Sequence, residues 1–246
     1  MLREYIRLLI EDAVRVNELK NVALYYGPNN EYILYNSSEA DRVIDELLTD
    51  VHNGEISIDM HYKTLRERFS DANLILGTLA FKHVPGRYYD AAIVKTAAAK
   101  KGFGPFLYDL VMANEGGLVA DRSAVSDRAK NVWNYYFHKR PDVEHKLLDD
   151  MEHPKTPPEI DDGIVYVSTD FVDGEGWKEN TKETLENPLN YAYFLKNAPD
   201  VKALEKEHNT LEEFMKKISN QLHVGEINYG KIIRIAAARF FDANNI

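Results

Sequence analysis

Apolar residues recur along this chain at helix spacing in some stretches and at strand spacing in others. The first apolar series predicts a helix over residues 2–19, with one face formed by Leu2, Ile6, Leu9, Ala13 and Val16. Two runs of β-favouring residues follow, at 22–26 and 31–35. The turn between them, Gly27-Pro-Asn-Asn30, predicts that they form a hairpin.

Helix and strand signals then alternate up to about residue 96. Ser38, followed three residues later by Asp41, predicts the start of a helix that runs to about Val51. Residues 55–60 alternate as in a strand, and residues 62–69 indicate a short helix. Residues 74–83 favour another strand. Pro85-Gly86 turns the chain into a further strand that ends at Thr96.

The stretch from Ala91 to Tyr136 organises this pattern. Ala91–Val94 is a short apolar run that predicts a buried strand, and a loop with two lysines and two glycines follows it. A helix is expected from Pro105 to Gly116-Gly117, because proline suits the first helical turn and glycine its end. The next strand is expected at 117–121. Ser123 or Ser126 then caps a helix with Ala129, Val132, Trp133 and Tyr136.

The C-terminal third changes in composition. Residues 149–162 are rich in proline and acidic residues, which indicates a linker or an extended arm. A strand is expected at 164–168 and a short helix at 189–194. Thr210 with Glu213 predicts a helix to about Leu222. The last helix, 227–241, is apolar over much of its circumference, so it packs in this chain's core or against a second copy.

We therefore expect two parts. Residues 1–148 form an α/β (α+β) core with an N-terminal helix and a mixed central sheet flanked by helices. Residues 149–246 form an arm and a helical C-terminal extension that packs on the core or on a partner. The hydrophobic content of 44% in 246 residues is enough for a real core.

Charge and residue usage argue against several classes of function and of targeting segment. The formal charge of −10 argues against general affinity for nucleic acid or acidic membranes. The chain has no cysteine, which fits a reducing compartment such as the cytoplasm. The charged residues in the first ten positions do not fit a signal peptide, and no apolar run approaches the ~20 residues of a membrane span. The eight histidines form no zinc-binding pattern, so we expect no metal site.

The loop after Val94 has the chemistry of an anion site. Gly102 and Gly104 allow close backbone approach at the start of a helix, where N–H groups and the helix dipole favour negative charge. Lys95, Lys100 and Lys101 add full positive charges. The loop matches neither a P-loop nor the glycine pattern of dinucleotide-binding proteins.

This order of strand, glycine loop, helix, strand and helix resembles the acetyl-CoA-binding half of the GNAT acyltransferase superfamily. In that superfamily Arg/Gln-x-x-Gly-x-Gly/Ala wraps the CoA pyrophosphate. Ala99-Lys-Lys-Gly-Phe-Gly104 matches it here, with alanine in the first place. The resemblance implies that acetyl-CoA or another acyl-CoA binds at Val94, Lys95, Thr96, Ala99, Lys100, Lys101, Gly102, Phe103 and Gly104.

A narrower resemblance is to the GNAT-like proteins of tailed bacteriophages, over roughly residues 84–204. It rests on Gly102-Phe-Gly-Pro-Phe-Leu-Tyr-Asp109, Gly116-Gly-Leu-Val-Ala-Asp-Arg-Ser123 and Val132-Trp-Asn-Tyr-Tyr136, with Leu148-Asp-Asp150 and Pro154-Lys-Thr-Pro-Pro158. It implies a phage-encoded protein that acts in the host cytoplasm or resides in the virion.

Acyl transfer needs a base for the amine proton and an acid for the departing thiolate. The resemblance implies a tyrosine acid on the helix after the second strand. The usual position falls on Trp133, and Tyr136 is the candidate acid, with a structural role as the alternative. For the base, Asp90, Asp121 and Ser123 are the nearest polar residues. Asp121 is our choice, with a chain of water molecules as the alternative.

Two functional classes remain open from the sequence. The first is an acyl-CoA-dependent N-acyltransferase that acetylates an amine on a protein or small molecule. The second is a non-catalytic virion or assembly protein on a GNAT scaffold, which would associate with itself or with other virion proteins. A module that binds CoA without turnover lies between them.

Overall fold

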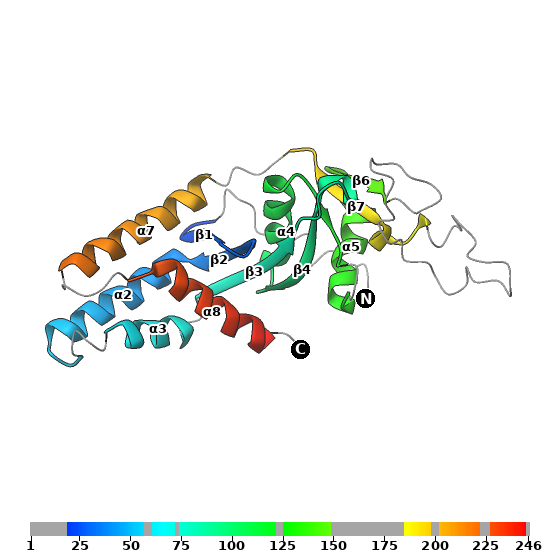
Figure 1. Cartoon of the computed structure of the whole chain (residues 1–246). Coiled ribbons are helices and arrows are strands. Elements are labelled where there is room, and N and C mark those ends of the chain that lie inside the picture. The colour runs from blue at the N-terminus through cyan, green and yellow to red at the C-terminus, as the bar shows by residue number, and fades with distance from the viewer. Residues whose placement is uncertain are drawn as a thin grey trace. The chain divides into compact units, whose positions relative to one another are not determined.

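The computed structural model describes residues 19–56, 61–71, 74–121, 125–148, 185–197, 202–221 and 227–244 (Figure 1). These residues form six α-helices and a seven-stranded mixed sheet with the strand order β1-β2-β3-β4-β5-β7-β6. The fold is therefore α+β, as the sequence predicted, with a mixed sheet and flanking helices. Among the described residues, none of the helices is long and apolar enough to span a bilayer.

Backbone contacts divide the chain into two compact units, which we describe separately. Among the described residues, the first unit contains 81–95, 108–121, 125–148 and 185–197. The second contains 19–56, 61–71, 74–80, 96–107, 202–221 and 227–244. Each unit thus combines stretches that lie far apart in the sequence.

The second unit is built on the predicted hairpin. Strand β1 (Val22–Gly27) pairs antiparallel with β2 (Glu31–Asn36), with Val22 opposite Asn36 and Gly27 opposite Glu31. Strand β2 also pairs antiparallel with β3 (Ile75–Lys82), and the register shifts between Leu34 and Tyr35. The hairpin prediction is confirmed, and every residue from Tyr32 to Tyr35 is buried.

Three helices of the second unit pack on this hairpin: α2 (Ser37–His52), α7 (Lys202–Gln221) and α8 (Tyr229–Asn244). Helix α3 (His61–Asp71) packs on α2 and α8. The apolar faces of these four helices join the hairpin in one core that includes Ile33, Tyr35, Ile44, Phe69, Met215 and Ile233. The last helix therefore buries one apolar face within its own chain, formed by Ile232, Ile233, Ala236 and Ala237, whereas Ile235, Phe240 and Phe241 are half-buried. Asn36 caps α2 by accepting from the Glu39 N–H at 3.1 Å, in place of the predicted Ser38.

In its described part, the first unit contains strands β5, β6 and β7 and helix α5, together with the beginning of β4 (Ala92–Ala99) and most of α4 (Phe103–Asn114). Strand β7 (Tyr191–Leu195) pairs antiparallel with both β5 (Leu118–Val119) and β6 (Val143–Leu147). Helix α5 (Asp127–Lys139) begins at Ser126, whose hydroxyl accepts from the Ala129 N–H at 3.3 Å. Its fully buried Trp133 and Tyr136 lie against Tyr193 of β7, with ring centroids 5.2 and 6.2 Å away.

Two further predicted elements need correction. The expected short helix at 189–194 is a single 3-10 turn, Pro188–Asn190, followed by strand β7, because pairing on both sides fixes this apolar run as a strand. Helix α7 begins at Lys202, so Thr210 is internal and its hydroxyl donates to the Lys206 carbonyl at 3.0 Å. Strand β6 was not predicted.

Several predictions lie outside the described residues. They are the N-terminal helix before residue 19, most of the strand expected at 55–60, the arm at 149–162 and the strand at 164–168. The predicted division between residues 148 and 149 stays a prediction, since the chain from 149 to 184 is not described.

Candidate functional site

The predicted cofactor residues form one continuous piece of backbone: a strand, a turn and the beginning of a helix. Val94, Lys95, Thr96 and Ala99 lie on β4 (Ala92–Ala99), and Lys100 to Gly102 form the turn. Phe103 and Gly104 open helix α4 (Phe103–Asn114), two residues before the predicted start. Val94 is buried, whereas Lys95, Thr96 and Lys101 are exposed.

The turn has a backbone shape that favours glycine. Gly102 has φ 90°, in the left-handed region that a Cβ disfavours. The Lys100 N–H donates to the Leu76 carbonyl at 2.8 Å, and the Phe103 N–H donates to the Lys100 carbonyl at 3.1 Å. The turn is thus fastened to strand β3 on one side and closed onto the helix on the other.

Helix α4 adds the partial positive charge of its N-terminus to this turn. A Cβ built on Gly104 would meet only the Cβ of Ala99, at 4.0 Å, so the space above the helix start is open. Burial lowers the pKa of Lys100, and the charge of Glu39 opposes that shift. The turn therefore combines a helix N-terminus with lysine charge, as an anion site requires.

Strand β4 is paired with β5 for only a short distance. Its parallel pairing joins Ala92 with Leu118 and Ile93 with Val119. Strand β5 ends at Val119, whereas β4 continues to Ala99. The edge of β4 that faces β5 therefore loses this partner after Ile93. An extended ligand can hydrogen-bond to such an edge.

Tyr136, the candidate acid, is fully buried in the first unit. Its hydroxyl donates to Asp109 Oδ1 at 2.7 Å, and Arg140 Nη1 donates to both Asp109 oxygens at 3.0 and 3.1 Å. Burial and the charge of Asp109 hold the pKa of Tyr136 well above its usual value. These contacts favour the structural role for Tyr136, and its role as an acid stays a prediction.

Asp121, the candidate base, lies two residues after the end of β5 and is half-buried. It belongs to the same unit as Tyr136, but the Tyr136 hydroxyl bonds to Asp109. Its role as a base also stays a prediction.

The polar cluster around Arg140 was not predicted from the sequence. Arg140 donates to Asp142 at 2.8 Å from Nε and at 2.6 Å from Nη2, in addition to its bonds with Asp109. Its guanidinium carbon lies 5.2 Å from the centroid of the Tyr136 ring. Burial raises the pKa of Asp109, and Arg140 opposes that rise. A carboxylate between the apolar residues Tyr108 and Leu110 was the signal in the sequence.

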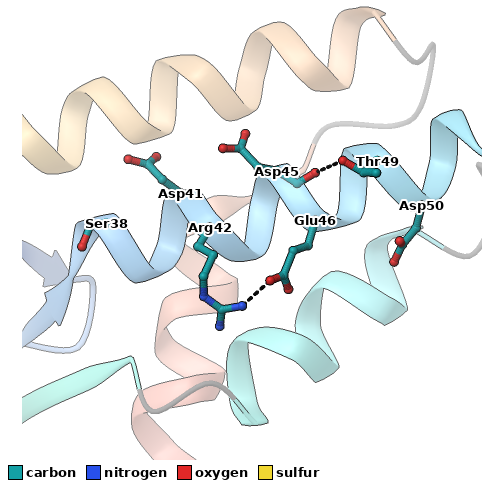
Figure 2. A pocket seen from close by; sticks show the side chains of 7 residues that line it. All are labelled: Ser38, Asp41, Arg42, Asp45, Glu46, Thr49 and Asp50. Carbon is teal, nitrogen blue, oxygen red and sulfur yellow. Dashed lines mark hydrogen bonds and ion pairs between the residues drawn. The ribbon is translucent and has the colours of Figure 1, made fainter.

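An open depression of about 470 Å³ lies along α2 (Figure 2). Its lining residues are Ser38, Asp41, Arg42, Asp45, Glu46, Thr49 and Asp50. Figure 2 shows Asp41 and Asp45 on the side of α2 toward α7, whereas Arg42 and Glu46 point away from α7 and pair with each other. Burial, followed by the charges of Asp45 and Glu207, raises the pKa of Asp41. This acidic lining repels the phosphates of a CoA.

A buried histidine joins α7 to the hairpin in the second unit. The Nδ1 atom of His208 is 2.8 Å from the Tyr35 hydroxyl. Its ring stacks on Tyr229 at 5.8 Å and lies 4.9 Å from the ring of Tyr25, and Nε2 is 3.9 Å from Glu212. Burial lowers the pKa of His208, and the charge of Glu212 opposes the shift.

Acidification should therefore weaken the second unit through His208. Its folded pKa is below the ordinary 6.5, so the unfolded chain takes up the proton at a higher pH than the folded chain. The contribution of neutral His208 to the unfolding free energy is complete above pH 6.5. It is lost as the pH falls from there toward the folded pKa, by up to about 1.4 kcal/mol per pH unit. The unfolding free energy of His208→Gln should fall less than that of the wild type between about pH 7.5 and about pH 5.5.

The matched control is His52→Gln, an exposed histidine in the last turn of α2. This variant should keep the wild-type pH response in urea denaturation. An identical response of the two variants would show that His208 does not carry the effect.

Among the described residues, no group of three or more His, Cys, Asp or Glu side chains is arranged to hold a metal ion. Comparison of the chain with protein-family models, with curated proteins and with solved structures finds no match.

Proposed function

We propose that the protein is a GNAT-like acyl-CoA-dependent N-acyltransferase that holds its cofactor on the segment from Val94 to Gly104. The observation that carries the proposal is the continuous unit of strand, turn and helix start, with φ 90° at Gly102. The resemblance of Ala99–Gly104 to the pyrophosphate loop of that superfamily supports the same assignment. The acidic depression on α2 is unsuitable for this anionic ligand.

In this proposal the CoA pyrophosphate lies at the N-terminus of α4. The backbone N–H groups of the turn approach its oxygens, which the absence of a side chain at Gly102 permits. The exposed Lys101 and the half-buried Lys100 supply the full charges that the alanine at position 99 does not. The pantetheine arm follows the edge of β4 near Val94, Lys95 and Thr96 and hydrogen-bonds to the backbone there.

The proposed chemistry is a direct transfer. The amine nitrogen attacks the thioester carbonyl carbon, a C–N bond forms, and the C–S bond breaks to release CoA as a thiolate. Asp121 is the proposed acceptor of the amine proton. The hydroxyl of Tyr136 is bonded to Asp109, so the proposal leaves protonation of the thiolate to solvent unless that contact opens.

Substitution of Gly102 by glutamate tests the cofactor site. The side chain would place a carboxylate where the phosphate approaches, and we expect calorimetry to show at least ten-fold weaker binding of acetyl-CoA. Loss of a single charge-assisted hydrogen bond, about 1.5–3 kcal/mol, already accounts for a change of that size.

The matched control is Gly54→Glu. Gly54 also has a positive φ, 74°, and a Cβ built on it would meet nothing within 4 Å. This variant carries the same added charge and a similar backbone strain at another turn of the second unit, so it should bind acetyl-CoA like the wild type. Equal affinities of the two variants would overturn the assignment of the loop.

A non-catalytic GNAT-like scaffold in the virion is the second candidate, and the buried hydroxyl of Tyr136 favours it. Release of free thiol from bound acetyl-CoA separates the two functions. The enzyme releases CoA when amines are added, whereas a scaffold or a CoA-sensing module binds acetyl-CoA and leaves it intact. In either case the proposed location is the host cytoplasm or the virion.

A further inference from the structure

A left-handed turn precedes strand β4 in the first unit. Three consecutive residues with side chains, Tyr88, Tyr89 and Asp90, have φ values of 57°, 56° and 60°. This conformation is unfavourable for each residue that carries a Cβ, and runs of it are rare. A backbone of this kind persists only where surrounding contacts impose it, and such sites cluster where a protein binds or reacts.

Contacts on both sides hold this turn. Asp90 accepts from the Gly86 N–H at 3.0 Å through Oδ1, and its own N–H donates to the Arg87 carbonyl at 2.8 Å. Tyr88 is buried beneath the Arg87 guanidinium. The Tyr89 hydroxyl donates to the Leu147 carbonyl at 2.6 Å. The strained backbone thus fixes the position of the Tyr89 ring.

The ring of Tyr89 meets the ring of Phe194 edge to face. Their centroids are 6.4 Å apart and their planes are at 84°. The ring of Phe194 packs closely against Gly117, because two of its carbons lie only 2.6 and 2.8 Å from the position that a Cβ of Gly117 would take. Both rings are half-buried, so each has a packed side and an open side.

A lysine ammonium occupies this ring pair. Lys146 Nζ lies 4.6 Å from the centroid of Phe194 and 5.8 Å from that of Tyr89, within the range of a cation–π contact. The same Nζ is 3.8 Å from Glu144 Oε1, so the lysine has a second partner within reach on its own strand. Lys146 can therefore leave the rings and keep a counter-charge.

From this arrangement we infer that Tyr89 and Phe194 form a binding site for an alkylammonium group, and that Lys146 is its resident occupant. The ligand is a primary alkylammonium ion, either a free amine or the side chain of a lysine on another molecule. It displaces Lys146 toward Glu144 and lies against both rings. Binding of an ammonium here does not require an acyl-CoA, so this site can fail while the proposed acyltransferase stands.

The test removes the ammonium group with Lys146→Met, which keeps an unbranched side chain, one heavy atom shorter, and deletes its charge. The probe is n-butylammonium chloride, and the readout is the ring resonances of Tyr89 and Phe194 in the full chain by NMR. We expect the variant to bind the probe about two- to five-fold more tightly than the wild type, which is the strength of an exposed cation–π contact.

Titrations with three other compounds show whether binding depends on the ammonium group. Sodium chloride at equal concentration should leave the ring resonances of Tyr89 and Phe194 unchanged. The same is expected of 1-butanol, a neutral molecule of similar shape. N-acetyl-lysine amide in place of butylammonium shows whether the site also takes a lysine side chain. Equal shifts with 1-butanol, or no shift of either ring in Lys146→Met with butylammonium, would overturn the inference.

Discussion

Replacement of Arg140 by methionine is expected to destabilise the protein by about 3–5 kcal/mol, because it leaves the largely buried carboxylate of Asp109 without its positively charged partner and, among the described residues, with only the Tyr136 hydroxyl bonded to it. The side chain of Asp109 is 19% exposed and that of Arg140 is 14% exposed, so water compensates the loss only in part. The variant also loses the contact of the guanidinium with the Tyr136 ring. Urea denaturation of both proteins at neutral pH measures the difference.

The neighbouring Lys139 supplies the control. It is exposed in the last turn of α5, and Lys139→Met should change the unfolding free energy by no more than about 0.5 kcal/mol. The loss of unfolding free energy in Arg140→Met should become smaller when the pH is lowered, since protonation of Asp109 removes the uncompensated charge. An Arg140→Met deficit as small as that of the control would contradict the role of the ion pair.

The second large effect is expected at Gly117, immediately before β5. A Cβ there would stand 2.6 and 2.8 Å from two ring carbons of Phe194 and 3.0 Å from the Cβ of Ala91. The residue also has φ 141°, which an L side chain rarely adopts. The unfolding free energy of Gly117→Ala should therefore fall by about 1–3 kcal/mol because of the strained φ, and by about 1–3 kcal/mol more because of overpacking.

Gly116→Ala separates these two contributions. Gly116 has φ 74°, but a Cβ built on it would meet nothing within 4 Å, so this variant has the backbone strain without the clash. Thermal or urea unfolding should place Gly117→Ala well below Gly116→Ala in stability. Equal losses in the two variants would mean that the ring of Phe194 moves aside at no cost.

Local signals in the sequence were sufficient for much of the fold. The turn at residues 27–30 predicted the hairpin, and Ser126 was one of two caps proposed for α5. Errors arose where a local signal competed with long-range pairing. Asn187-Pro188 is typical of a helix start, yet the following residues form β7, which is hydrogen-bonded on both sides.

Helix α7 shows a different limit of prediction from local sequence patterns. Thr210 and Glu213 match a capping box, but the buried stripe of Leu204, His208, Leu211 and Met215 already begins near Lys202. Packing against β1 and α2 extends the helix through the apparent cap. Side-chain packing therefore decides this boundary, and the capping pattern does not.

The candidate site was predictable only in its contiguous part. The residues from Val94 to Gly104 follow one another along the chain, and their strand, turn and helix are visible as a local pattern. The polar clusters are not visible in this way. Tyr35 and His208 are 173 positions apart, and Asp109 and Arg140 are 31 apart, so only the folded chain brings each pair together.

The most direct test of the central claim is a calorimetric titration of the wild-type protein with acetyl-CoA, set against the same titration with acetylpantetheine. The two ligands share the thioester arm, and only acetyl-CoA carries the pyrophosphate. If the turn at Gly102 holds the phosphates, acetyl-CoA binds in the micromolar range and acetylpantetheine binds at least ten-fold more weakly. Absence of binding at millimolar acetyl-CoA, or equal affinity for the two ligands, would contradict the proposed cofactor site.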